Sequence, residues 1–497
     1  MQNINNEDIF GLVNSLTKSE KAYFKKYSNQ HVKGEKNDYI VLFEMFEKSN
    51  NDNTFNIEKE FQNLNIKNIS RVKNYLHDVI LKSLISYHAE NSIDAEIRED
   101  LRKIEVLWDK SLHEQCSKLL LKTKKNISKY DKKIFLLEVL EWESKLIIEK
   151  PTLNDAYANL LLNRNHSIFT LQGIMQQVEY DFIGRSFTLG FQSKNRDLIG
   201  SDSVFLNNIQ KYIVNCDEEF VEDGNLKMSY FLIATLYYIS NNNYAKAREI
   251  SDKLLKYLDK NENFIISNLT KYITIITNNV ILNFDLNDFE TAAQFVEIHK
   301  KIENKYLKFC SKEVRTVLNF DSIICNINLL IETNRENELF EFVSGLKEKI
   351  GDDYELSHLT RREALYYVSL SRCYFELNDF KQALFWLNKL FSNRKLESSY
   401  IYNDALIYEL VIHYELGNYD YVENRIRSLK RYFKINNNNF EIDIVKILEK
   451  YLIDRMNKIE LRALKNDIEN DNVVQLFSTN FGKFSIKRWI NKKASVL

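Results

Sequence analysis

The second half of the chain repeats one pattern of residues. Each of the two clearest copies places an aromatic residue, a second aromatic seven residues later, a third after six more, and an alanine after another three. The copies consist of Phe231, Tyr238, Tyr244 and Ala247, and of Tyr367, Tyr374, Phe380 and Ala383. This spacing predicts two helices packed antiparallel about a tight polar turn. Stacked pairs of this kind leave one long surface free, which favours binding over chemistry.

Further segments keep the phase of the pattern. We call the third aromatic position of each copy its anchor. The five equivalent anchors are Tyr244, Phe289, Glu336, Phe380 and Tyr419. They lie about 39 to 47 residues apart, and the third copy has glutamate in place of the aromatic. The chain has one proline and 11 glycines in 497 residues, so few residues interrupt helices, and period-two strand patterns are weak. We therefore expect an all-α fold.

The repeated phrase resembles the tetratricopeptide repeat, a helix-turn-helix unit of about 34 residues whose family binds proteins and peptides. The copies here are longer, and they lack the proline that usually ends each unit, since Pro151 is the only proline. The resemblance implies a right-handed α-α superhelix made of helical hairpins. It also implies a non-enzymatic scaffold or adaptor that holds a partner segment in its concave groove.

Four regions follow from the pattern. Residues 1–92 lack the phrase and form an expected N-terminal helical domain, with a capping box at Thr17 and Glu20 and an amphipathic helix from Ile69 to Tyr87. Residues 93–225 contain expected degenerate helical repeats, interrupted by a predicted loop or hinge at 173–200, where four glycines lie. Residues 226–436 carry the repeats, and residues 437–497 are expected to supply capping helices.

Residue patterns for catalysis and for metal or cofactor binding are missing. The eight histidines include no His-Glu-x-x-His, the five cysteines are scattered singly, and the glycines form no dinucleotide or phosphate loop. We expect no enzyme, no cofactor and no metal. The formal charge of −1 makes nucleic acid an unlikely partner. The sequence shows no signal peptide and no membrane-spanning run, so we expect a cytoplasmic protein without membrane insertion.

Aligning the repeats on their anchors suggests a partner-binding site. Large apolar residues stand five positions before each anchor, and four of them are Phe284, Ile331, Phe375 and Tyr414. Acids stand four positions before the last four anchors, namely Asp285, Glu332, Glu376 and Glu415. Helix dipoles disfavour acids near helix C-termini, by about 0.3–1 kcal/mol each. One interpretation is an acidic ladder beside an apolar shelf, which suits a basic amphipathic segment of a protein or peptide partner. The other is a set of solvated residues at turn edges.

In the same alignment, Arg372 stands eight positions before its anchor, where the family's clamp for a peptide carboxylate has polar groups. Since the equivalent positions of the other repeats are mostly apolar, a free C-terminal carboxylate is a poor match. The basic tail around Trp489 is expected to close the array as a capping helix, with its charges in water.

A regulator that binds nucleic acid is the alternative function. Residues 57–61, a turn at 63–65 and the helix from Ile69 have the proportions of a helix-turn-helix. The face of that helix opposite its apolar stripe presents polar and basic residues that could meet phosphates and bases, namely Ser70, Arg71, Lys73, Asn74 and His77. Any exposed helix in a chain this rich in lysine and asparagine would look similar, which favours a plain solvated face.

Overall fold

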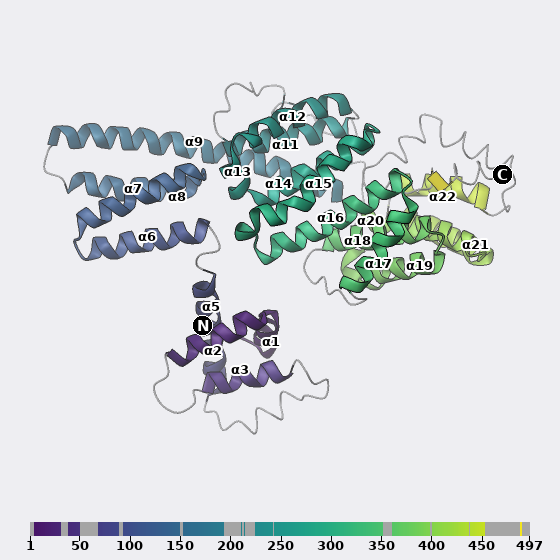
Figure 1. Cartoon of the computed structure of the whole chain (residues 1–497), viewed down its shortest axis with the longest axis horizontal. Helices are drawn as coiled ribbons and strands as arrows, with labels where there is room; N and C mark the ends of the chain where they lie inside the picture. Colours follow the sequence, from purple (N-terminus) through teal and green to yellow (C-terminus); the bar gives the residue numbers. More distant parts are fainter. Residues whose placement is uncertain are drawn as a thin grey trace. The chain divides into compact units, whose positions relative to one another are not determined.

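The computed structural model contains helices and loops throughout its described residues (Figure 1). It describes residues 4–30, 38–49, 68–88, 93–149, 153–192, 210, 213, 224–241, 243–350, 360–397, 400–436, 438–452 and 488–489. Within these ranges no strand occurs, which confirms the predicted all-α class. The chain divides into two compact units, Met1–Thr123 and Lys124–Leu497, and the division lies inside a helix and later than the predicted boundary at residue 92.

The first unit is a small helical domain with its own core. Its helices are α1 (Asn6–Ser15), α2 (Lys18–Gln30), α3 (Asp38–Ser49), α5 (Ile69–Tyr87), α6 (Ile93–Asp109) and the start of α7 (His113–Lys129). The predicted capping box is present, because the Thr17 backbone N–H donates to Glu20 Oε2 at 2.7 Å and the Glu20 N–H donates to Thr17 Oγ1 at 3.2 Å. Helix α5 has the predicted bounds, and its Leu76 and Ile80 are buried against α1 to α3.

The second unit is an array of helices, most of which form antiparallel pairs. Two helices at its start are α8 (Lys133–Ile148) and the long α9 (Leu153–Gln192). The pairs that follow are α11 (Gly224–Ser240) with α12 (Tyr244–Asp259), α14 (Leu269–Asp285) with α15 (Phe289–Tyr306), α16 (Lys312–Glu332) with α17 (Glu336–Ile350), α18 (Thr360–Glu376) with α19 (Phe380–Ser392), and α20 (Tyr400–Glu415) with α21 (Tyr419–Ile435). Short α13 (Glu262–Ser267) precedes α14, and α22 (Asn439–Leu452) packs on α20 and α21. The first helices of neighbouring pairs also contact each other, from α14 through α16 and α18 to α20.

The same turn joins the two helices of successive pairs. A residue with positive φ stands two positions before the second helix in four of them, and these residues are Asn287, Asn334, Asn378 and Gly417. The next residue donates its N–H to the carbonyl five positions back, as Asp379 does to Tyr374 at 2.8 Å. This left-handed residue with its longer backbone bond is a common way to end a helix, and asparagine and glycine tolerate it best. All five predicted anchors are the first residues of second helices.

The turn also appears in the region of the degenerate repeats. Ser111 and Asp131 have positive φ two residues before α7 and α8 begin, and the following residues make the same long backbone bond. Asn, Asp, Ser and Gly therefore all fill one structural role here. The turn is a better marker of the helix pairs than the aromatic phrase, which these earlier helices lack.

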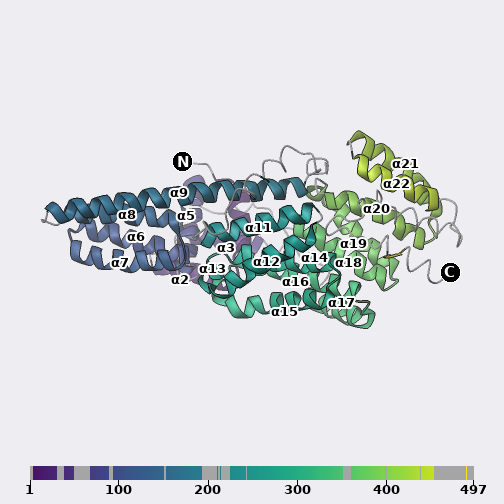
Figure 2. The ribbon, with the colours of Figure 1, turned by 90° about the horizontal axis from the view of Figure 1, so that it is seen from above.

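Helix α9 corrects one prediction. The loop or hinge expected at 173–200 is helical as far as Gln192, and residues 193–200 lie outside the described residues. Isolated glycines cost a helix about 1 kcal/mol each, and packing along α8 and α11 offsets that cost (Figure 2). At Gly184 an added Cβ would lie 3.9 Å from Ile233 of α11, which is an ordinary van der Waals contact, so the close packing of α9 on α11 does not depend on this glycine.

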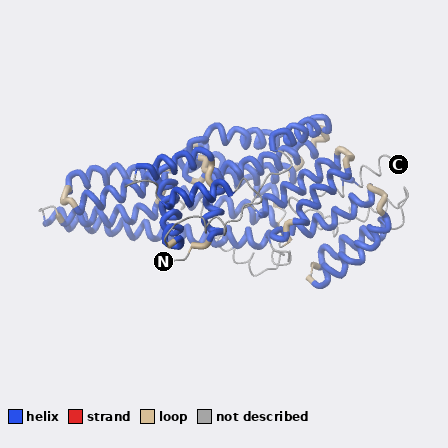
Figure 3. The backbone as a smooth tube through the Cα atoms, turned by 90° about the horizontal axis from the view of Figure 1, so that it is seen from below, coloured by secondary structure: helices blue, strands red, loops and turns tan. Residues whose placement is uncertain are grey.

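The described part of the second unit is built of helices joined by short loops (Figure 3). Its apolar side chains are buried between successive helices. One stretch in the described residues, Val314–Glu332 of α16, is long and apolar enough to cross a bilayer. However, 61% of that window is buried inside the protein, and α16 contacts α14, α15, α17 and α18. A core helix of a helical array has this composition.

Candidate partner-binding surface

The four predicted acids occupy equivalent places in the fold. Each is the last residue of the first helix of its pair: Asp285 in α14, Glu332 in α16, Glu376 in α18 and Glu415 in α20. This agrees with their predicted position at helix C-termini, where the dipole disfavours negative charge. Their surroundings, however, differ from those of a solvated row.

Glu376 is buried and carries an ion pair with the C-terminal region of the chain. Its side chain is 4% exposed, and its Oε2 lies 3.2 Å from Nε of Arg488. The Arg488 guanidinium also donates from Nη2 to Asn334 Oδ1, in the turn between α16 and α17. A planar guanidinium can serve two acceptors in fixed directions. The expectation that the tail charges stand in water is therefore wrong for Arg488.

The next residue, Trp489, occupies the adjoining repeat. Its indole Nε1 donates to Glu415 Oε1 at 2.7 Å, and its ring meets the Tyr414 ring edge to face with centroids 5.9 Å apart. The Trp489 side chain is buried in the main core of the second unit. Arg488 and Trp489 thus contact the ends of α18 and α20 at once. We call the four residues they contact, Asn334, Glu376, Tyr414 and Glu415, the docking surface.

The remaining predicted charges have partners elsewhere in the second unit. Arg372 is buried, donates from Nη1 to Asn328 Oδ1 at 2.7 Å and lies 3.5 Å from Glu332. Asp285 lies near Tyr244, where burial, and secondarily the Asp285 carboxylate, raises the pKa of the phenol. The predicted ladder is therefore a set of separate polar sites, and only Glu376 and Glu415 meet the same segment.

The predicted apolar shelf is also corrected. Ile331 and Phe375 are buried in the core, whereas Phe284 and Tyr414 are half-buried. Phe375 packs on Tyr408 of α20 with ring centroids 5.3 Å apart. In two of these four repeats, the residue five positions before the anchor therefore packs inside the helix array and is not part of an exposed shelf. Of the four shelf residues, Tyr414 is the one that reaches the docking surface.

Two of the residues proposed to bind nucleic acid form hydrogen bonds with α1 or with the segment just before it. Lys73 Nζ donates to Asn6 Oδ1 at 2.6 Å, and Asn74 Oδ1 accepts from the Ile4 N–H at 3.3 Å. Ser70 and Arg71 are exposed and His77 is half-buried. The first helix and turn of the proposed helix-turn-helix, at 57–61 and 63–65, lie outside the described residues. The contacts of Lys73 and Asn74 give α5 a packing role within the first unit.

Among the residues that the structure describes, no group of three or more His, Cys, Asp or Glu side chains could hold a metal ion. Four cysteines in these ranges are free and buried, at positions 116, 310, 325 and 373. Burial raises the pKa of the Cys325 and Cys373 thiols, and thiols of raised pKa are poor nucleophiles. These cysteines act as small core residues.

Two contacts of the docking surface were not predicted from the sequence. Asn334 was predicted only as part of a turn, and its side-chain oxygen accepts a hydrogen bond from Arg488. The pairing of Arg488 with Glu376 joins residues 112 positions apart, since 488 minus 376 is 112. The sequence held one signal for these contacts. The tail has a cation next to an aromatic residue, Arg488 and Trp489, and the repeats have acids and an aromatic residue that can pair with them.

Comparison with known proteins gave no match: no family model, no curated protein and no solved structure is significantly similar to the chain.

Proposed function

We propose that the chain is a protein-interaction scaffold or adaptor without catalytic activity, in which a right-handed superhelix similar to that of tetratricopeptide proteins presents the docking surface to a partner. The partner segment has a cationic residue followed by an aromatic one, in a basic amphipathic stretch. The observation that supports this proposal is the seating of Arg488 and Trp489 on Glu376, Asn334, Glu415 and Tyr414.

The chemistry of these contacts explains why a partner of this kind fits. An ion pair to a buried carboxylate needs a cation with further hydrogen bonds, which an arginine supplies. A buried indole contributes a large apolar area and one N–H donor, which Glu415 accepts. Tryptophan and arginine are also the residue types that most often dominate the energy of protein interfaces.

In this proposal the chain's own Arg488 and Trp489 compete with a partner for the docking surface. A segment of the same chain competes at an effective concentration that its tether sets, which a partner in solution must overcome. A partner must therefore bind tightly or arrive when the tail is displaced. The acids of the surface add electrostatic steering, which increases the association rate and weakens as salt is added.

The test uses a fluorescent peptide of residues 483–497 added to the chain in trans. The Arg488→Ala/Trp489→Ala variant vacates the docking surface, and we expect it to bind the peptide about tenfold or more tightly than the natural chain does. Adding Glu415→Gln to that variant should weaken peptide binding, whereas Glu423→Gln on α21 should not. Circular dichroism melting curves establish that each variant is folded.

A peptide with alanine at both positions serves as the ligand control and should bind weakly. The proposal fails if the vacated, folded variant binds the peptide no better than the natural chain, or binds the alanine peptide equally well. In that case Arg488 and Trp489 are only a cap on the helix array.

A further inference from the structure

Helix α9 exposes a continuous apolar stripe. Its members are each 40–69% exposed and are Tyr157, Leu161, Ile168, Leu171, Met175, Val178 and Phe182. At 100° per residue they fall within an arc of about 100° along some 25 residues of helix. We call this set the α9 stripe. Two further exposed apolar residues of α9, Leu162 and Phe169, lie beyond one edge of this stripe. Single exposed apolar residues are ordinary, but a contiguous row of this length marks an interaction surface.

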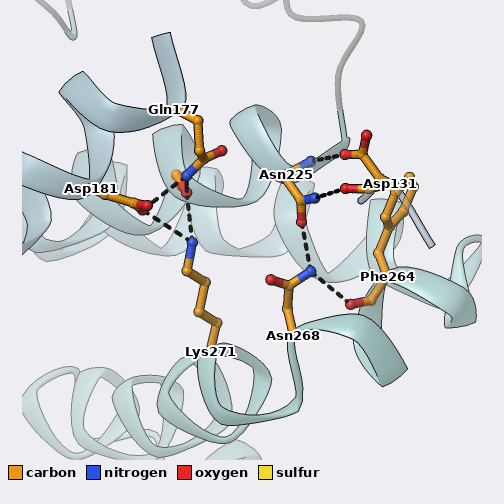
Figure 4. Close-up of polar contacts among 8 residues, drawn as sticks. Asp131, Gln177, Asp181, Asn225, Phe264, Asn268 and Lys271 are labelled. Atoms are coloured by element: carbon orange, nitrogen blue, oxygen red, sulfur yellow. Dashed lines mark hydrogen bonds and ion pairs between the residues drawn. The ribbon is translucent and has the colours of Figure 1, made fainter. Parts of the chain in front are cut away.

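The face of α9 that packs against the rest of the second unit carries polar residues that form hydrogen bonds and an ion pair. Gln177 Nε2 donates to Asp181 Oδ1 and to Ser229 Oγ of α11, both at 2.9 Å, and Lys271 Nζ of α14 lies 3.2 Å from Asp181 (Figure 4). Further along, Asn163 Nδ2 donates to the Leu140 carbonyl of α8 at 3.0 Å. These polar residues lie roughly 120° around the helix from the stripe.

Further hydrogen bonds join the starts of three neighbouring helices, α8, α11 and α14. The Asn225 backbone N–H donates to Asp131 Oδ2 at 3.3 Å, and its side chain donates to the Asp131 carbonyl at 3.0 Å (Figure 4). Asn268, at the start of α14, donates to Asn225 Oδ1 at 2.6 Å. The bonds that α9 itself makes, from Gln177, Asp181 and Asn163, therefore fix its rotation about its axis, and the stripe faces away from them.

The spacing of the stripe is that of a coiled-coil seam. From Leu161 the apolar residues recur at intervals of seven, three, four, three and four, so that positions 161, 168, 175 and 182 form one heptad column and 171 and 178 form the other. Such a seam is self-complementary, because the knobs of one helix fit the holes of an identical helix. Covering seven side chains of this size removes on the order of 800 Å² per chain from water, which is what a stable protein interface buries on each side.

One charged residue indicates the orientation of the pair. Arg164 occupies a position of the second column, and in a parallel pair in register it would face its own copy. In an antiparallel pair the first column of one helix faces the second column of the other, so in the register whose facing positions sum to 339, Arg164 lies opposite Met175. The same register places Ile168 opposite Leu171, Leu161 opposite Val178, and Tyr157 opposite Phe182. An antiparallel pair therefore avoids placing two like charges against each other in the seam.

We infer that the α9 stripe is a self-association surface, which binds the α9 stripe of a second copy of this chain as an antiparallel helix pair. This surface is separate from the docking surface on α18 and α20, so one dimer would present two docking surfaces. A bivalent scaffold gains avidity for a partner that carries two copies of the recognised segment.

Sedimentation equilibrium of the full chain tests the inference. We expect twice the mass of one chain, with dissociation on dilution. The Leu171→Glu/Met175→Glu variant should sediment as a monomer, because two charges per helix would enter the centre of the seam. The matched control is Phe340→Glu/Ile435→Glu, which adds the same charges at exposed apolar residues of α17 and α21 and should leave the mass unchanged. A natural chain that is monomeric at every concentration, or a stripe variant that remains dimeric, overturns the inference.

Orientation is measured separately with a spin label at Ala158→Cys, an exposed position beside the stripe. In the antiparallel register the labelled residue faces position 181 of the other copy, so the two labels lie about 35 Å apart along the pair. The chain with its native cysteines alone gives the background signal. A label separation under about 20 Å would contradict the antiparallel arrangement, because a parallel pair in register brings the two positions together.

Discussion

Helix α9 and the helices α18 to α21 distribute their side chains in opposite ways. On α9, polar residues such as Gln177 and Asp181 bond inward while apolar residues lie exposed. In α18 to α21, charged residues such as Arg372, Glu376 and Glu409 are buried. The buried charges are matched within the chain, whereas the apolar residues of the α9 stripe are exposed, and we infer that a second copy of the chain covers them.

An unusual residue in a helical array is either matched by partners inside the protein or left exposed at its surface. Glu409 illustrates the first case, since its Oε2 accepts from Arg425 Nε at 3.0 Å and its Oε1 accepts from the Tyr421 hydroxyl at 2.7 Å. Burial and this bond to Glu409 raise the pKa of Tyr421 to about 12. The buried charge of Glu409 is thus matched by hydrogen-bond partners within the protein. Among the described residues the α9 stripe has no comparable partners, since its side chains are 40–69% exposed.

The largest effect should come from breaking the matched charges. Replacing Arg425 with leucine leaves the Glu409 carboxylate buried without its cation, and we expect the free energy of unfolding to fall by about 3 kcal/mol. Urea denaturation followed by circular dichroism measures this change. The matched control is Arg427→Leu, two residues along α21, whose exposed pair with Glu423 should cost no more than about 0.5 kcal/mol.

A double variant makes this comparison sharper. In Arg425→Leu/Glu409→Leu both charges are gone, and we expect it to recover most of the stability lost in the single variant, because apolar groups often replace a buried ion pair without loss. Equal losses in Arg425→Leu and Arg427→Leu would show that the Glu409 site is hydrated in solution and is not an interior charge.

An intermediate effect should appear as a pH dependence of stability. His299 of α15 is 1% exposed, and neither ring nitrogen has a hydrogen-bond partner among the described residues. Burial lowers the pKa of its imidazole; Asp321 of α16 acts to raise it, and Arg362 of α18, which is paired with Asp321 at 3.0 Å, acts to lower it. The neutral ring is therefore the form that the folded protein accommodates.

The direction of the effect follows from linkage. Because the folded-state pKa lies below the unfolded value of about 6.5, the unfolded chain binds more protons in mild acid. The contribution of His299 to stability is complete above pH ~6.5 and is lost as the pH falls toward the folded pKa, by at most about 1.4 kcal/mol per pH unit. We expect His299→Leu to remove this slope in urea denaturation between pH ~7 and ~5. His413, whose pKa burial also lowers, is retained in both proteins, so parallel pH profiles would exclude His299 as the source.

The contrast between the two regions also marks what the sequence could predict. The repeated phrase located the start of the second helix in all five pairs, including the one with Glu336 at the anchor, because helix periodicity and turn chemistry are local properties. The loop or hinge predicted at 173–200 from its four glycines was wrong for residues 173–192, because isolated glycines are tolerated in a helix that packs along its neighbours. The spacing of residues 161 to 182 was a visible signal for a long helix with an exposed seam.

The candidate site was harder to predict because it depends on distant contacts. The position of Glu376 and Glu415 at helix ends followed from the alignment, but their pairing with Arg488 and Trp489 did not. Neither periodicity nor propensity specifies which of many acids a tail residue will meet. Burial of Ile331 and Phe375 likewise depends on how closely successive pairs pack, which is a property of the assembled array.

The smallest effects should come from two adjacent residues of α9, where the apolar Val178 is exposed and the polar Gln177 faces the rest of the protein. Val178 is 62% exposed, and we expect Val178→Lys to change the unfolding free energy of the dilute, monomeric chain by less than about 0.5 kcal/mol. Gln177→Leu removes the two inward hydrogen bonds and should cost about 1 kcal/mol, although it replaces a polar residue with an apolar one. Dilution is essential because a dimer would add its own stabilisation. If Val178→Lys proved the more costly change under these conditions, the stripe would be covered within a single chain, and the distinction between the two regions would disappear.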